Sequence, residues 1–135
     1  MNSRWICLAL VVLAAGCKTP ELQEPPAKPF VGTHWQVVLD LPLAGEQPNM
    51  RFGDGRVEGF GGCNKFSAPY LQDSVGAAAI IIRRIDVGRH ACEPGVQAVE
   101  DRVLAVLQSS TSYRIFVDSM VFSGSAGSLK LKAIP

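Results

Sequence analysis

The sequence has no excess of charge of one sign, since 13 Lys and Arg residues stand against 12 Asp and Glu residues in a chain of 135. It has no basic run either, which argues against a nucleic-acid partner held by phosphate neutralisation. The chain is too short for a kinase, a TIM barrel or a two-domain dehydrogenase, and it fits one folded domain. With 47% hydrophobic and 19% charged residues, a packed core is expected and a disordered chain is excluded.

Long hydrophobic runs are also missing. The apolar stretch over residues 5–15 follows Arg4, the only charged residue before it. As a helix this stretch would rise only about 16 Å, whereas the hydrocarbon core of a bilayer is about 30 Å thick. A short apolar stretch behind a positive start, with small residues at its end, predicts a secretory signal rather than a transmembrane helix.

The end of this stretch, LAAGC over residues 13–17, resembles the lipobox of bacterial lipoproteins. In such signals a peptidase cuts before the cysteine, whose thiol carries a diacylglyceryl group, and several acyl chains give a stable membrane anchor. The resemblance implies a signal peptide over 1–16 and a lipidated Cys17; a plain secretory signal with an incidental Cys17 is the alternative. Lys18 stands where an Asp would often mark retention in the inner membrane, so we expect a lipid-anchored protein of the outer membrane facing the periplasm.

Residues 17–29 read as a tether between this anchor and a globular domain over 30–135. The tether carries four prolines among charged and polar residues. Proline fixes φ and removes a backbone donor, so such a segment stays extended and unpacked. At about 3 Å per residue, it can hold the globular domain up to roughly 35 Å from the anchor.

Most of the globular part is typical of an antiparallel β domain. Short runs rich in β-forming residues predict strands over 34–41, 49–52, 56–60, 77–85, 113–117, 120–123 and 128–133. Asp54-Gly55 predicts a tight turn, because glycine supplies a positive φ. Ile80-Ile81-Ile82 suits a strand covered on both faces. Alternation in the last run places Leu129 and Leu131 toward the core.

One segment, residues 96–107, has the helical period instead. Its apolar residues recur at three- and four-residue steps, with Glu100 and Asp101 on the opposite, solvent-facing side, and Pro94 suits the first turn. A lone helix this short is marginal in water, so its apolar stripe must pack against the sheet. We therefore expect a mainly β (α+β) fold, a small antiparallel β-barrel-like sheet with one packed amphipathic helix.

The densest local motif is GFGGCNKFS over residues 59–67. It is not a phosphate-binding loop, because its glycines do not follow GxGxxG and no Gly-Lys-Ser/Thr follows. We interpret it as a strand whose glycines allow a bulge or the close approach of another backbone.

The longer stretch DGRVEGFGGCNKFS, residues 54–67, resembles the hallmark of META domains, the family of the heat-shock-inducible HslJ lipoproteins of bacteria. Further matches follow in order, from GTHW at 32–35 through RHAC at 89–92 to the closing strands, and span about residues 32–133. Gly88 and His90 depart from the family, which usually has Thr and Met there, and Ala68 replaces a common Gly. The resemblance assigns a structural role to the motif residues Trp35, Gly59, Gly62, Asn64, Phe66, Arg89 and Glu100.

The resemblance implies an envelope lipoprotein of a family linked to stress and drug tolerance, for which no enzymatic activity is established. We therefore expect a monomeric, non-enzymatic protein without a cofactor, held at the membrane by its anchor and acting through contacts with envelope proteins. The alternative is a lipoprotein that binds a small ligand in its β-barrel. A filled core would weaken this alternative, and a large apolar cavity would favour it.

The cysteines leave one pair in the mature chain, because Cys7 departs with the signal and Cys17 carries lipid. A Cys63–Cys92 disulfide would suit an oxidising periplasm, with two reduced, buried thiols as the alternative. Zinc held by these cysteines with His34 and His90 is less favoured, because the sequence has neither CxxC nor HxxxH.

Candidate catalytic groups are weak as well. Ser67, His90 and Asp86 could be assembled into a triad, but no Gly-x-Ser-x-Gly supports it. Two carboxylate pairs are interpreted as solvated charges, namely Asp54 with Glu58 and Glu100 with Asp101.

Overall fold

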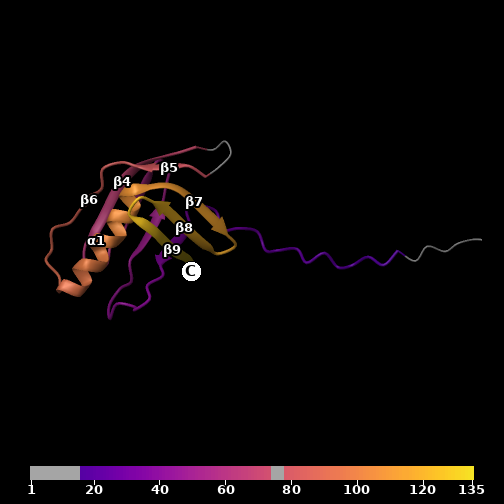
Figure 1. The fold of residues 1–135 in the computed structure, drawn as a ribbon, viewed down its shortest axis with the longest axis horizontal. Coiled ribbons are helices and arrows are strands. Elements are labelled where there is room, and N and C mark those ends of the chain that lie inside the picture. The colour runs from indigo at the N-terminus through magenta and orange to yellow at the C-terminus, as the bar shows by residue number, and fades with distance from the viewer. Residues whose placement is uncertain (1–15, 74–77) are drawn as a thin grey trace, which may run out of the picture.

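The computed structural model describes residues 16–73 and 78–135. Except for Gly16, the expected signal peptide lies outside these residues. The described chain forms a nine-stranded antiparallel sheet and one α-helix (Figure 1). The strands are β1 (His34–Val37), β2 (Asn49–Phe52), β3 (Arg56–Phe60), β4 (Lys65–Gln72), β5 (Ile80–Ile82), β6 (Asp86–Val87), β7 (Ser110–Phe116), β8 (Ser119–Gly124) and β9 (Gly127–Ile134), and the helix is α1 (Pro94–Ser109).

The sheet curls until its two edges meet. The strand order is β5-β4-β3-β2-β1-β9-β8-β7, with β6 paired to β4. At the seam, Ala79 forms an isolated bridge with Ser112, and the Tyr113 amide donates to the Ala78 carbonyl at 2.9 Å. The architecture is therefore a nearly closed antiparallel barrel, and the expected fold class is confirmed.

Side chains fill the inside of this barrel. Inward residues alternate with outward ones along each strand, and Leu129 and Leu131 of β9 face inward, as their spacing predicts. In the paired strands β1 and β2, Trp35 lies opposite Met50, and neither side chain has exposed surface. Other buried side chains in this core are Val37, Phe52, Val57, Phe66, Tyr70, Ile80, Val103, Leu107, Met120 and Phe122. The interior is a packed core.

The helix begins with Pro94 in its first turn, as its sequence predicts, and packs against β5, β8 and β9. Its residues Val103, Val106 and Leu107 are buried. Near its end, the Gln108 side-chain amide donates to the Ile82 carbonyl of β5 at 2.8 Å. The helix thus covers the sheet beside the seam. It is the one helix of the described residues, and it is neither long enough nor apolar enough to cross a bilayer.

Two strand predictions are corrected by the structure. Ile81 is 54% exposed, because none of residues 16–73 and 78–135 covers the outer face of β5, so the expectation that this strand is covered on both faces was wrong. The first strand ends at Val37 instead of residue 41, and residues 38–48 form the connection to β2.

The N-terminal segment crosses one end of the barrel before β1 begins. Phe30 is 8% exposed and packs its ring against Phe52, Tyr70 and Tyr113, with ring centroids 4.2, 5.7 and 4.5 Å away. Burial raises the pKa of Tyr70 above its ordinary value of 10.0. Residues 16–29 form neither helix nor strand and are exposed. The Lys28 amide still bonds to the barrel, and the part of the segment before it runs away from the barrel (Figure 1).

Candidate functional site

The glycine-rich motif lies at the opposite end of the barrel, where β3 turns into β4. The turn covers residues 61–64, in which the Gly61 amide donates to the Asn64 carbonyl at 2.9 Å. Gly62 has a φ of 119°, a conformation that favours glycine. The interpretation of 59–67 as one strand is therefore corrected to the end of one strand, a turn and the start of the next.

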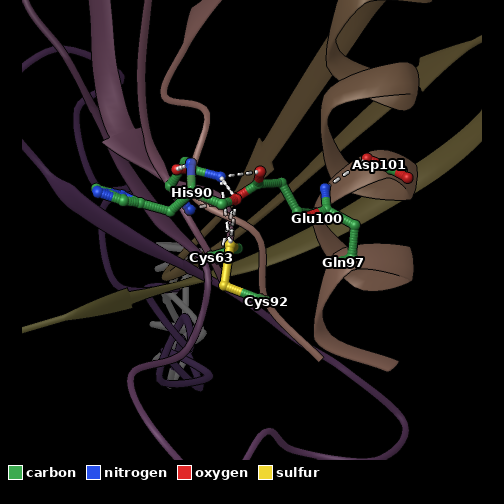
Figure 2. The surroundings of a disulfide bond; sticks show 7 residues. Cys63, His90, Cys92, Gln97, Glu100 and Asp101 are labelled. Atoms are coloured by element: carbon green, nitrogen blue, oxygen red, sulfur yellow. Dashed lines mark hydrogen bonds between the residues drawn. A yellow bond between two sulfur atoms is a disulfide. The ribbon is translucent and has the colours of Figure 1, made fainter. Parts of the chain in front are cut away.

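Glu100 of α1 reaches this turn with its carboxylate (Figure 2). The carboxylate accepts hydrogen bonds from the Cys63 amide at 3.0 Å, the Asn64 amide at 2.5 Å and the Asn64 side-chain Nδ2 at 3.0 Å. Glu100 is 2% exposed, so its assignment to the solvent face of the helix was wrong. The reason is that the turn offers donors at the edge of the apolar stripe, and a buried charge is retained where such donors surround it.

Gly61 allows this close approach. A Cβ at position 61 would lie 2.8 Å from both Cγ and Oε2 of Glu100, closer than packed atoms come. Gly61 was not among the motif residues to which the resemblance assigned a structural role. The signal in the sequence is the pair Gly61-Gly62, in which one glycine provides the turn conformation and the other the space for the carboxylate.

Asn64 joins a third segment to the turn. Its Oδ1 accepts from the His90 amide at 2.8 Å, and its Nδ2 donates to the His90 carbonyl at 3.1 Å. A Cβ at Gly88 would lie 2.8 Å from the same Oδ1. The departure from the usual Thr at position 88 therefore fits the close contact between this segment and Asn64.

A disulfide between Cys63 and Cys92 closes the same group of segments, with Cα atoms 6.0 Å apart (Figure 2). The pairing excludes both the reduced thiols and the zinc site that the sequence left open. In the described part of the chain, no group of three or more His, Cys, Asp or Glu residues is placed to hold a metal. We call Cys63, Asn64, His90, Cys92 and Glu100 the motif cluster.

The remaining motif residues lie around this cluster or in the core. Phe66 is 4% exposed and pairs in register with Gly59, where a Cβ would lie 2.9 Å from Met50 Cβ. Trp35 is fully buried inside the barrel. Arg89 is exposed beside the cluster. The structure thus gathers Gly62, Asn64 and Glu100 at one place and distributes the other motif residues.

The candidate catalytic groups are engaged elsewhere or open to solvent. Ser67 and Asp86 pair in register, but Ser67 Oγ accepts from Arg56 Nη2 at 2.8 Å, and no hydrogen bond joins Ser67 to His90 within residues 16–73 and 78–135. Asp54 and Glu58 are exposed.

Apart from the His90 ring, the polar atoms of the motif cluster face one another. The Glu100 carboxylate is occupied by the turn, the Asn64 amide by the turn and the His90 backbone, and the sulfur atoms by the disulfide. The His90 side chain is exposed and points away from the carboxylate (Figure 2). Such an arrangement fastens α1 and residues 88–92 to the barrel rather than presenting reactive groups.

Comparisons with known proteins agree with this architecture. A family model described as META domain matches residues 28–133. An NMR structure of a protein from Burkholderia xenovorans superimposes with a TM-score of 0.63 at 19% identity, over 87% of this chain and 97% of that chain. A second NMR structure gives a TM-score of 0.59 at 15% identity, over 74% and 87% of the two chains. Comparison with curated proteins finds no match.

Proposed function

The chain belongs to the META domain family, and from this premise we propose that it is a non-enzymatic lipoprotein of the cell envelope. In this proposal Cys17 carries the lipid, the anchor lies in the outer membrane facing the periplasm, and the barrel acts through contacts with other envelope proteins. In this proposal its role lies in envelope stress or drug tolerance, which the family resemblance supports.

The observation that carries the proposal is the Cys63–Cys92 disulfide within the motif cluster. Disulfides form and persist in oxidising compartments and are rare in the cytosol. An exported chain agrees with the lipobox resemblance at residues 13–17, and the exposed residues 16–29 leave room for an anchor away from the barrel.

A groove at the end of the barrel opposite the tether is suited to protein contacts. The connection after β1 exposes Val38 by 48% and Leu41 by 84%. These side chains border a groove whose other wall includes Val99 and Arg102 of α1. Exposed apolar side chains gathered beside charged ones are typical of surfaces that bind other proteins.

Binding of a small ligand inside the barrel is the less favoured function. The interior is filled by Trp35, Phe52, Phe122 and their neighbours, which leaves a ligand little space. The buried carboxylate of Glu100 is occupied by donors of its own chain, so it offers no free group to orient a ligand.

The test measures lipid attachment, membrane location and protein contacts. Full-length protein is produced in a bacterium with labelled palmitate, and its envelope proteins are cross-linked and recovered with it. We expect label in the outer-membrane fraction and loss of both label and membrane attachment in Cys17→Ser.

The cross-linked proteins test the groove. A specific cross-linked protein that is lost in Leu41→Asp but retained in Leu71→Asp, a change on β4, would support contact through the groove. Intact Met1 on cytosolic material would contradict the proposal.

A further inference from the structure

We propose that the barrel docks on the lipid bilayer through the β7–β8 hairpin, with Lys28, Arg114, Phe116 and Lys132 facing anionic phospholipid headgroups. We call these four residues the hairpin surface. This inference rests on the proposed function in one respect, because an anchor at Cys17 would keep the surface beside the membrane.

The N-terminal segment leaves the barrel at this hairpin. The Lys28 amide donates to the Val117 carbonyl in the β7–β8 turn at 2.7 Å, and Figure 1 shows the segment departing there. Val117 has a φ of 56°, an unfavourable conformation for a β-branched side chain that persists only where its surroundings hold it. The hairpin therefore lies where the segment that begins at Cys17 meets the barrel.

Phe116 is the apolar element of the surface. Along β7, Tyr113 and Ile115 pack against the core, whereas Arg114 and Phe116 point outward. Phe116 is 62% exposed. Aromatic side chains with this exposure are suited to the boundary between lipid chains and headgroups.

Positive charges flank Phe116 on the same outer face. Arg114 lies two residues away on β7, and register places Phe116 opposite Ser119, which in turn lies opposite Lys132 of β9. Lys132 Nζ is 3.6 Å from Asp118 Oδ2, an exposed pair that water screens. With Lys28 at the junction, three cations accompany one acid, which favours an anionic surface.

The tether makes even weak docking effective. From Cys17 to Lys28 the chain spans about 34 Å in the polyproline II conformation. A tether of this length gives the hairpin surface an effective concentration at the bilayer on the order of millimolar. One aromatic side chain and a few cations are then sufficient to hold the barrel against the membrane.

Leu41 provides a matched contrast. It is more exposed than Phe116, at 84%, but it lies in the connection of residues 38–48 at the other end of the barrel (Figure 1). If exposure alone drove insertion, Leu41 would enter the bilayer first. If the tether and charge orient the barrel, Phe116 enters and Leu41 does not.

The test uses the lipidated protein in vesicles of phosphatidylethanolamine and phosphatidylglycerol with brominated acyl chains. Phe116→Trp and Leu41→Trp each add one exposed indole to the buried Trp35. We expect lipid bromine to quench the Trp at position 116 and to leave the Trp at position 41 unchanged. Adding Arg114→Gln and Lys132→Gln should weaken the docking about fivefold per cation removed, and high salt should act in the same direction.

The outcomes separate the docking from the proposed function. Protein that floats with the vesicles without quenching at position 116, or with equal quenching at both positions, overturns the docking alone. Protein without acyl chains overturns the lipoprotein proposal. For protein without acyl chains, quenching at position 116 measured at higher lipid concentration still tests the docking. The headgroups are contacted by the hairpin surface and not by the anchor. Equal quenching in vesicles of phosphatidylcholine alone would contradict the role of the cations.

Discussion

A carboxylate removed from water keeps its charge only where hydrogen-bond donors replace the lost hydration. Glu100 has three such donors, two backbone amides and the Asn64 side chain. Bonds to an ionised acceptor are stronger than neutral ones. At the scale of single residues, this side chain therefore connects α1 to the turn that precedes β4.

Replacing Glu100 by Gln tests this connection. Glu100→Gln keeps the size of the side chain but turns one acceptor into a donor, which must then face another donor, either the backbone amides of the turn or Asn64 Nδ2. We expect the free energy of unfolding to fall by about 2–3 kcal/mol, because charge-assisted bonds are lost and a buried donor is left unsatisfied. Urea unfolding followed by the fluorescence of the buried Trp35 measures the change.

Asp101→Asn is the matched control for this substitution. Asp101 is exposed and accepts a hydrogen bond from Gln97 four residues earlier on the helix. We expect a change of less than about 0.5 kcal/mol, as is usual for such pairs. Equal effects of the two substitutions would mean that the turn does not depend on the Glu100 carboxylate.

At the scale of elements, the Cys63–Cys92 disulfide links the β3–β4 turn to the segment before α1, across 29 residues of chain. We expect Cys63→Ser with Cys92→Ser to lower the free energy of unfolding by about 3–4 kcal/mol, since the unfolded chain regains the freedom of this loop. Thermal unfolding with and without reductant measures this loss of stability. The double variant should unfold at the same temperature in both conditions. An unchanged midpoint for the native chain in reductant, together with two alkylated thiols, would show that the bond does not form.

At the scale of the whole molecule, the barrel has two distinct ends. Phe30 packs into one end, where the tether departs, and the motif cluster fastens the other. Between the two ends the interior is packed, so the barrel of the native protein should contain no apolar cavity that binds a ligand.

A filled barrel predicts no saturable binding of an apolar fluorescent probe by the native protein. Leu131→Ala, at a fully buried position, should lower the free energy of unfolding by about 2–5 kcal/mol and increase probe binding, because it opens a cavity in the core. Probe titration of both proteins at a temperature where each is folded provides the comparison. Stoichiometric binding to the native chain would favour the ligand-binding function instead.

The sequence by itself determined features that depend on neighbouring residues. Alternation placed Leu129 and Leu131 inside, Pro94 marked the start of the helix, and Asp54-Gly55 marked a turn, where Gly55 has a φ of 73°. Each follows from backbone preferences and periodicity over a few residues.

Only the tertiary structure decided which polar residue is buried. Glu100 looks solvent-facing on its own helix, and its donors come from a turn 36 residues earlier in the chain. Ile81 looks buried within its run, but no other described residues cover the outer face of β5. Burial depends on what the fold brings to a position, and periodicity along one segment contains no information about partners from distant segments.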